Sequence, residues 1–219
     1  DLLVELLRHY FQLTLVVNGQ PKNGKKAAEP LLKTSKTYVI GLHPHGVAPT
    51  ATTIAVMTDA CGVKEKVFGK VNVRLGVATW CFTIPAYREM FGAAGFKDVS
   101  KFNLAKLLKA GTSVMMYPGG SQEAEFAFPD KHALSLQRKQ GFVRLALEHG
   151  ADLVPVYSFG ENACYDQVQA TWKPFLSFRD KFHRMSGITI LFLKNIIPRP
   201  AKCTVVVGAP IPVNKVANP

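Results

Sequence analysis

The stretch YVIGLHPHG, residues 38–46, joins an apolar segment to a polar turn. Its first five residues are a short apolar run with a glycine, which is typical of a buried strand. Pro44 disfavours helix at the preceding residue, and Gly46 accepts backbone angles that other residues avoid. We therefore expect His43 and His45 in a stiff turn at the carboxyl end of a strand, where open α/β sheets keep their chemistry.

Histidine is the side chain whose ordinary pKa lies near neutrality, so it can take and return a proton at cellular pH. Two imidazoles framed by proline and glycine favour a functional site, and a purely structural pair stays open as the alternative. The His-x-His spacing also resembles the first metal-binding strand of a barrel metallohydrolase, which would need further ligands. No recognisable ligand set is completed by the remaining histidines, which are His9, His132, His149 and His183.

Strand patterns and helical patterns alternate along the rest of the chain. The expected strands are residues 38–42, 67–73, 113–117, 153–158, 189–193 and 204–207, and the expected helices are residues 1–17, 50–60, 100–109 and 138–149. This alternation predicts an α/β fold with a mostly parallel or mixed central sheet flanked by helices. We expect an amphipathic helix and a polar linker over residues 1–36, followed by one domain over residues 37–219.

A second candidate site is YPGGSQE, residues 117–123, which again follows an expected strand. Free N–H groups around Gly119 and Gly120 could hold an oxyanion or a phosphate, because glycines let a ligand approach the backbone closely. Glu123 could orient an imidazole or stabilise it as the imidazolium. An ordinary strand-to-helix turn with a capping carboxylate is the alternative.

Three further features are weaker signals. Arg138 and Lys139 open an expected helix and are either a solvated basic turn or an anion site. The segment FGEN, residues 159–162, follows a strand and could close the same pocket as the histidines. Arg88 could serve an anionic ligand or a surface salt bridge.

The charge balance indicates an anionic partner. Lys and Arg total 27 against 15 Asp and Glu, a net charge of +12 at pH 7. Nucleic acid, a phospholipid surface and a phosphorylated small molecule all fit this charge. Nucleic acid is the least expected, because no basic stripe with interleaved aromatic residues is present. No apolar run reaches the ~20 residues of a membrane span.

Other enzyme and binding classes lack their motifs. The chain contains no G-x-S-x-G, no G-x-x-x-x-G-K-[ST] and no G-x-G-x-x-G sequence, so a hydrolase serine, a P-loop and a dinucleotide fold are not expected. The cysteines are never in CxxC spacing, which argues against a zinc site. We expect all four to be reduced and buried: Cys61, Cys81, Cys164 and Cys203.

Five separated blocks occur in an order that resembles the diacylglycerol O-acyltransferase type 2 family. They are HPHG at 43–46, PAYRE at 85–89, YPGGSQEA at 117–124, RKQGFVRLALEHGADLVPVYSFGEN at 138–162 and VVVGAPIPV at 205–213. The family also includes monoacylglycerol and wax-alcohol acyltransferases, and it lies within the glycerolipid acyltransferase superfamily. The resemblance covers residues 38–213 and assigns an acyltransferase catalytic domain to residues 37–219.

The resemblance implies transfer of a fatty acyl group from acyl-CoA to the hydroxyl of diacylglycerol, giving triacylglycerol. Monoacylglycerol or a long-chain alcohol is the alternative acceptor, and a non-catalytic module that binds lipid or acyl-CoA is the alternative of another class. Acyl-CoA is then a co-substrate, with no permanently bound cofactor and no metal. A glycerolipid and a membrane surface are the expected partners, without nucleic acid.

The resemblance also implies roles for individual residues. His45 is the expected base and His43 the orienting or stabilising group, although the two roles could be reversed. The wider superfamily uses His-x4-Asp, but the corresponding positions here are Thr50 and Ala48, so Glu123 is the candidate partner of the histidine. Backbone N–H groups at Gly119 and Gly120 would hold the oxyanion. The candidates for the phosphates of CoA are Arg88, Arg138 and Lys139.

Family members usually carry an N-terminal hydrophobic hairpin in the endoplasmic reticulum membrane and a C-terminal helical segment. Neither is found in this sequence, so we expect the catalytic core of a longer protein. It would lie on the cytosolic face of the endoplasmic reticulum or on a lipid droplet. The helix expected over residues 1–17 has one apolar face and could rest on that surface.

Overall fold

The structure is a computed structural model that describes residues 2–18, 29–137, 139–217 and 219. These residues form a mixed seven-stranded sheet in the order β1-β9-β6-β2-β5-β3-β4. Its strands are β1 (Thr14–Val17), β2 (Tyr38–His43), β3 (Val73–Val77), β4 (Lys97–Asp98), β5 (Ser113–Met116), β6 (Asp152–Phe159) and β9 (Thr204–Val207). A separate two-stranded sheet pairs β7 (Gln167–Val168) with β8 (Phe192–Leu193).

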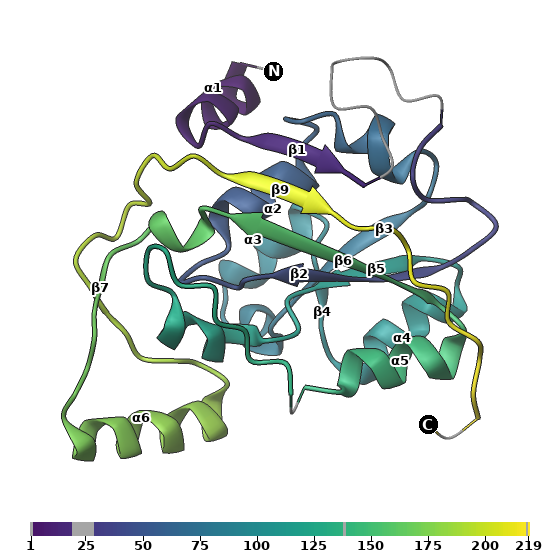
Figure 1. The fold of residues 1–219 in the computed structure, drawn as a ribbon. Helices are drawn as coiled ribbons and strands as arrows, with labels where there is room; N and C mark the ends of the chain where they lie inside the picture. Colours follow the sequence, from purple (N-terminus) through teal and green to yellow (C-terminus); the bar gives the residue numbers. More distant parts are fainter. Residues whose placement is uncertain (1, 19–28, 138, 218) are drawn as a thin grey trace.

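Helices surround the main sheet, as Figure 1 shows. They are α1 (Leu2–Tyr10), α2 (Thr50–Met57), α3 (Tyr87–Ala93), α4 (Lys101–Lys109), α5 (Gly141–His149) and α6 (Lys173–Ser186). Short turns of other helix types are η1 (Lys64–Phe68), η2 (Thr79–Phe82), η3 (Gly120–Phe126) and η4 (Glu161–Ala163). No helix among the described residues has both the length and the apolar character needed to cross a bilayer. The α/β fold with a mostly parallel sheet is therefore confirmed.

Strand β2 is the centre of the sheet and is buried along its whole length. It pairs in parallel with β5 on one side and β6 on the other. Its side chains alternate between two cores: Ile40 and Leu42 pack in the cluster that contains Ala51 of α2, whereas Val39 packs with Leu104 of α4. Both faces are covered, which explains why the strand is a continuous apolar run in the sequence.

Strands β4, β3, β5, β2 and β6 run in the same direction, and β9 is antiparallel to β6. The segments that follow these five parallel strands therefore meet at one edge of the sheet. That edge brings together HPHG after β2, YPGG after β5 and the FGEN segment at the end of β6. The fold places the motifs of the sequence side by side, as expected from the rule for open sheets.

Several secondary-structure predictions were wrong. The helix expected over residues 1–17 ends at Tyr10, and residues 14–17 form β1, which pairs in parallel with β9. In the strand expected over residues 67–73, the first two residues belong to η1 and residues 69–72 are not extended strand, so β3 begins only at Val73. Only residues 192–193 of the expected strand 189–193 are extended, in the small sheet. Part of the linker expected within residues 1–36, residues 19–28, lies outside the described residues.

Candidate active site

His45 has a defined tautomer in this structure. Its ring Nδ1 lies 3.0 Å from the carbonyl oxygen of Gly46. A carbonyl only accepts hydrogen bonds, so Nδ1 must carry the proton. The lone pair then resides on Nε2, the atom that a general base uses. The ring also makes an edge-to-face contact with Tyr117, with centroids 5.5 Å apart.

Glu123 reaches His45 through the main chain rather than through the ring. One carboxylate oxygen, Oε2, accepts the His45 N–H at 2.9 Å, and Oε1 accepts the Ser135 N–H at 3.0 Å. The side chain is 2% exposed. The acid therefore holds the HPHG turn in place, and the group that orients the imidazole is the Gly46 carbonyl. Sequence reasoning had expected the acid itself to orient the ring.

His43 lies behind His45. It is the last residue of β2, it is buried, and its Nδ1 has no hydrogen-bond partner among the described residues. Burial lowers the pKa of His43, and the charge of Glu123 partly offsets this effect. His43 is not one of the residues that line the cavity described next. The two histidines thus occupy different environments, and only His45 faces open space.

A cavity of about 770 Å³ opens beside His45. One wall, which we call the apolar wall, comes from β3, η2, α3 and the turn before β4, and includes Val77, Trp80, Phe91 and Phe96. Part of the uncharged apolar run over residues 75–87 lines this cavity. The size and apolar lining suit a ligand with long hydrocarbon chains.

The glycine turn after β5 also borders the cavity, at Gly119 and Gly120. The Gly120 N–H donates to the carbonyl of Tyr117 at 3.0 Å, so it is already engaged. The Gly119 N–H has no partner in the described part of the chain. Of the two expected oxyanion donors, the structure therefore leaves Gly119 free and Gly120 occupied.

The cationic residues expected at the site do not all lie at the cavity. Lys139 lines the cavity. Arg88 does not, because it lies exposed on α3 and pairs with Glu89 at 2.7 Å. Arg138 lies outside the described residues. Sequence reasoning missed His183, which lines the cavity from α6; a single histidine on an exposed helix gives little signal.

Glu161 belongs to the FGEN segment, which was expected to close the pocket of the histidines, but its side chain binds the main chain of α2. It is 1% exposed and accepts the N–H groups of Ala51 at 3.1 Å and Thr52 at 2.7 Å, together with the Thr52 hydroxyl. Pro49 precedes α2 and makes no capping hydrogen bond by its side chain. The carboxylate of Glu161 thus caps α2 from a distant segment, where the helix dipole favours negative charge.

Comparison with known sequences identifies the family. The sequence model of the family described as diacylglycerol acyltransferase matches residues 4–219. The chain belongs to the diacylglycerol acyltransferase family. The resemblance carried by the five sequence blocks is thereby confirmed.

Curated relatives agree with this family. Human 2-acylglycerol O-acyltransferase 3 is 34% identical, over 97% of this chain and 63% of its own length. Human diacylglycerol O-acyltransferase 2 is 32% identical, over 86% of this chain and 52% of its own length. The Dictyostelium discoideum diacylglycerol O-acyltransferase 2 is 32% identical, over 100% of this chain and 66% of its own length. The chain thus spans about half to two thirds of the relatives it matches.

One solved structure has a similar fold. The 1-acyl-sn-glycerophosphate acyltransferase PlsC of Thermotoga maritima superposes with a TM-score of 0.50 at 12% identity. The match covers 95% of this chain and 67% of the bacterial chain. At this identity the similarity shows a shared fold and no more.

Burial sets the protonation state of His45 in this family member. Desolvation lowers the pKa of His45 below its ordinary 6.5, while the Gly46 carbonyl and the Glu123 charge oppose the shift. A lowered pKa keeps the ring neutral at pH 7, so Nε2 is available as a base. If His45 is the base, kcat/KM is constant near neutrality and falls on acidification with a midpoint below 6.5. A pH profile of transfer from about pH 5 to about pH 9 checks this; an acid limb centred above 6.5 would contradict it.

The two glycines of the turn predict different mutant phenotypes. A Cβ on Gly119 would overlap the Glu123 carboxyl group, whereas a Cβ on Gly120 meets nothing within 4 Å but sits at a φ of +61°. Gly119→Ala should displace Glu123 from the His45 N–H and lower both the melting temperature and transfer activity. Gly120→Ala should cost about 1–2 kcal/mol of backbone strain without moving Glu123. Thermal unfolding and transfer rates of the two variants check this, and equal activity losses would refute it.

Proposed function

We propose that this chain catalyses acyl-CoA-dependent transfer of a fatty acyl group to a lipid hydroxyl, with His45 as general base. The observation that carries the proposal is the geometry of His45. Its Nδ1 proton is held by the Gly46 carbonyl, and its ring faces an apolar cavity of about 770 Å³. The names of the curated relatives, which are acylglycerol acyltransferases, support the same reaction class.

The reaction proceeds by direct transfer. Nε2 of His45 takes the proton of the acceptor hydroxyl as its oxygen forms a bond to the thioester carbonyl carbon. The tetrahedral intermediate collapses by breaking the carbon–sulfur bond, and the CoA sulfur leaves with the proton that His45 returns. Base catalysis of this kind contributes ~10²–10⁴-fold to the rate. No acyl-enzyme and no metal is required.

The surrounding groups support this cycle in distinct ways. The buried Glu123 carboxylate fixes the main chain of His45 and stabilises the imidazolium that forms during the reaction. The free Gly119 N–H is the donor that we assign to the developing oxyanion. His43 lies outside the cavity lining, so its proposed role is to stabilise the site rather than to take the proton.

Diacylglycerol is the acceptor that we favour, giving triacylglycerol as product. Two of the relatives quoted above are named diacylglycerol O-acyltransferase 2, whereas the third is named for 2-acylglycerol. Monoacylglycerol is therefore the second candidate acceptor. The cavity accommodates hydrocarbon chains of either lipid on its apolar wall.

An acceptor-competition assay tests the function. The purified chain in mixed micelles receives labelled oleoyl-CoA with equal amounts of diacylglycerol, 2-monoacylglycerol and hexadecanol, and the labelled products are separated. Labelled triacylglycerol as the main product supports the proposal. Labelled diacylglycerol or wax ester would reassign the acceptor. Saturable oleoyl-CoA binding without any product would instead favour a non-catalytic binding module.

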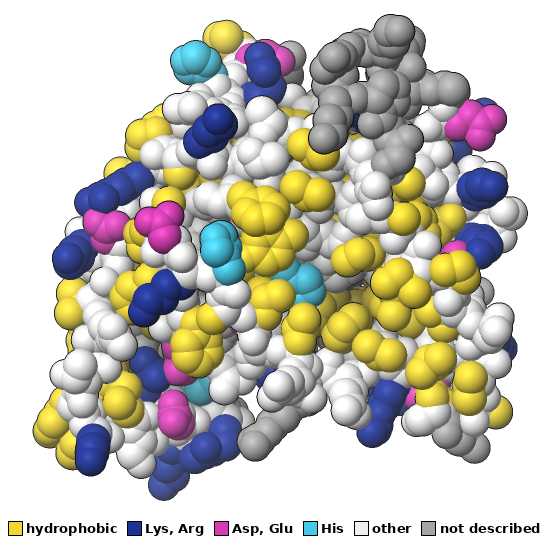
Figure 2. All heavy atoms as spheres, in the orientation of Figure 1, with side chains coloured by type: hydrophobic (Ala, Val, Ile, Leu, Met, Phe, Trp, Pro, Cys, Tyr) yellow, Lys and Arg dark blue, Asp and Glu magenta, His cyan; other side chains and the backbone are white. Residues whose placement is uncertain are grey.

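We also propose that the protein works at a membrane, on the cytosolic face of the endoplasmic reticulum or on a lipid droplet. Leu2, Leu3 and Leu6 of α1 are 77%, 63% and 58% exposed. The Tyr10 hydroxyl donates to the carbonyl of Pro198, which joins α1 to a segment where Ile197 is also exposed. Lys and Arg side chains are spread over the face seen in Figure 2, which suits anionic lipid. Sedimentation with anionic vesicles tests this, and a chain left in the supernatant would count against it.

A further inference from the structure

The cavity beside His45 has a second, polar wall. Its four residues are Ser121 in η3, Lys139 just before α5, His183 in α6 and Thr189 in the segment after α6. It contrasts with the apolar wall, which carries Trp80, Phe91 and Phe96 and comes from a different part of the chain. Ser121, Lys139, His183 and Thr189 together are called the polar wall. A cavity with this division favours a ligand that has one charged part and one hydrocarbon part.

Hydrogen bonds fix His183 in the polar wall. Its Nδ1 lies 2.9 Å from the hydroxyl oxygen of Thr189, which lies 3.5 Å from the hydroxyl oxygen of Ser121. Ser121 in turn donates to the carbonyl of Gly187 at 2.7 Å. The shorter contact favours donation from the Thr189 hydroxyl to Nδ1. Nε2 of His183 then carries the ring hydrogen and can donate it to an anionic oxygen.

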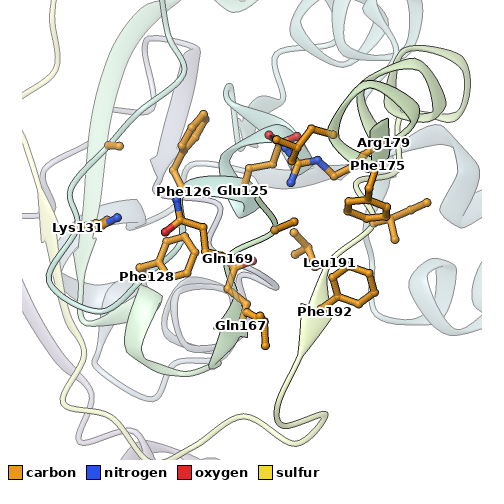
Figure 3. A pocket seen from close by; sticks show the side chains of 15 residues that line it. Glu125, Phe126, Phe128, Lys131, Gln167, Gln169, Phe175, Arg179, Leu191 and Phe192 are labelled. Carbon is orange, nitrogen blue, oxygen red and sulfur yellow. Dashed lines mark hydrogen bonds and ion pairs between the residues drawn. The ribbon is translucent and has the colours of Figure 1, made fainter. Parts of the chain in front are cut away.

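No side chain of α6 is fully buried, and both aromatic and polar contacts hold the helix: Phe175 packs on Phe192, with ring centroids 4.9 Å apart. Arg179, one turn before His183, forms an ion pair with Glu125 of η3, and both side chains are only 12% exposed. Figure 3 shows the pair above the aromatic side chains of a neighbouring pocket, with the Arg179 guanidinium turned toward Glu125. This pair attaches α6 to the same turn that carries Gly120 and Ser121.

The charge of the polar wall is positive. Arg179 is paired with Glu125 and, at 3.8 Å, with the half-exposed Asp180 of α6. The positive charge on the cavity lining that acts on His183 is that of Lys139. Figure 2 shows further Lys and Arg side chains over α6, at the lower left. Phosphate groups bind where an ammonium and several N–H or O–H donors converge.

We propose that Lys139 and Nε2 of His183 bind the phosphates of the acyl donor, so that the donor enters along the polar wall and its acyl chain lies against the apolar wall. This inference rests on the proposed function, because it assigns the nucleotide-bearing thioester to a place in the same cavity. It adds His183, which no motif of the sequence indicated, and it gives the donor a direction relative to His45.

The test compares ligands with and without phosphates. Binding of CoA and of pantetheine, which lacks the nucleotide, is measured by calorimetry for the full chain, for His183→Asn and for Lys139→Ala. Asparagine keeps an acceptor oxygen near the position of Nδ1 and removes the Nε2 donor. Each substitution should reduce the affinity for CoA relative to pantetheine about tenfold, as expected for one charged hydrogen bond. His149→Asn is the matched control, since the His149 ring bonds to the Leu145 carbonyl on α5, does not line the cavity and should not alter this ratio.

The same variants are then assayed for transfer with oleoyl-CoA and with oleoyl-pantetheine. A tenfold drop in the ratio of the two kcat/KM values supports the inference. A ratio equal to that of the unmodified chain in both variants would overturn it, as would equal weakening of CoA and pantetheine binding. Phosphate-dependent CoA binding without any product would leave the phosphate site standing and refute the transferase proposal. Product formation with an unchanged ratio would leave the transferase proposal standing and refute the phosphate site.

Discussion

His45→Ala should lower kcat for acyl transfer by ~10²–10⁴-fold while the protein stays folded. The substitution removes Nε2, the nitrogen left with a lone pair after Nδ1 has donated to the Gly46 carbonyl. It leaves untouched the main-chain N–H of His45, which donates to Glu123, so the turn keeps its anchor. Steady-state rates with oleoyl-CoA and diacylglycerol measure the effect, and circular dichroism checks the fold.

Two other substitutions make this result specific. His45→Gln places an amide near the position of Nε2 but cannot accept the proton, so it should be about as slow as His45→Ala. His132→Ala removes a histidine that is exposed and bonds to the Tyr157 hydroxyl outside the cavity, and it should retain the unmodified rate. If His45→Gln turned over at the unmodified rate, proton transfer at this position would be excluded.

Of the substitutions considered, Glu161→Ala should cause the largest loss in the free energy of unfolding, on the order of 4 kcal/mol. The change leaves the N–H groups of Ala51 and Thr52 and the Thr52 hydroxyl without the acceptor that they share. Each unsatisfied buried donor costs about 1–3 kcal/mol. Burial also raises the pKa of Glu161, which reflects how little water reaches this carboxyl group. Urea unfolding followed by far-ultraviolet circular dichroism measures the loss.

A matched pair of variants separates capping from charge. Glu161→Gln keeps one acceptor oxygen and should lose clearly less stability than Glu161→Ala. Glu148→Ala removes a carboxylate that pairs with Lys101 at the protein surface, and it should change stability far less than Glu161→Ala. If Glu161→Ala unfolded at the same urea concentration as Glu148→Ala, the capping role would be wrong.

The central strands could be predicted because their apolar residues lie close together in the sequence. β2 and β5 are buried at every position, whereas β6 alternates buried and more exposed residues. Each strand leads into a glycine-containing turn, and the rule that parallel strands present their carboxyl ends together placed these motifs at one edge. β1 escaped prediction because its four residues continue an amphipathic pattern, and only pairing with β9 makes them a strand. The long helix α6 was missed because it buries no side chain completely.

The candidate site was predictable in part for the same reason. His45, Gly119 and Lys139 were expected at the site and line the cavity. The sequence could not show that Glu123 would bind a main-chain N–H instead of the ring, because that depends on a contact between residues 78 positions apart. Arg88 follows an apolar block that borders the cavity, yet its side chain pairs with Glu89 on the surface. The contacts of Glu123 and Arg88 depend on how the chain packs, which the sequence alone does not give.

The most direct test of the account is chemical rescue of His45→Ala. Truncation of the ring opens space beside the cavity, so imidazole added to the buffer can occupy the place of the lost base. The account predicts that triacylglycerol formation by the variant rises with the concentration of neutral imidazole and that the unmodified chain does not respond. A rate for the folded variant that stays flat as imidazole is added would contradict proton removal at this position.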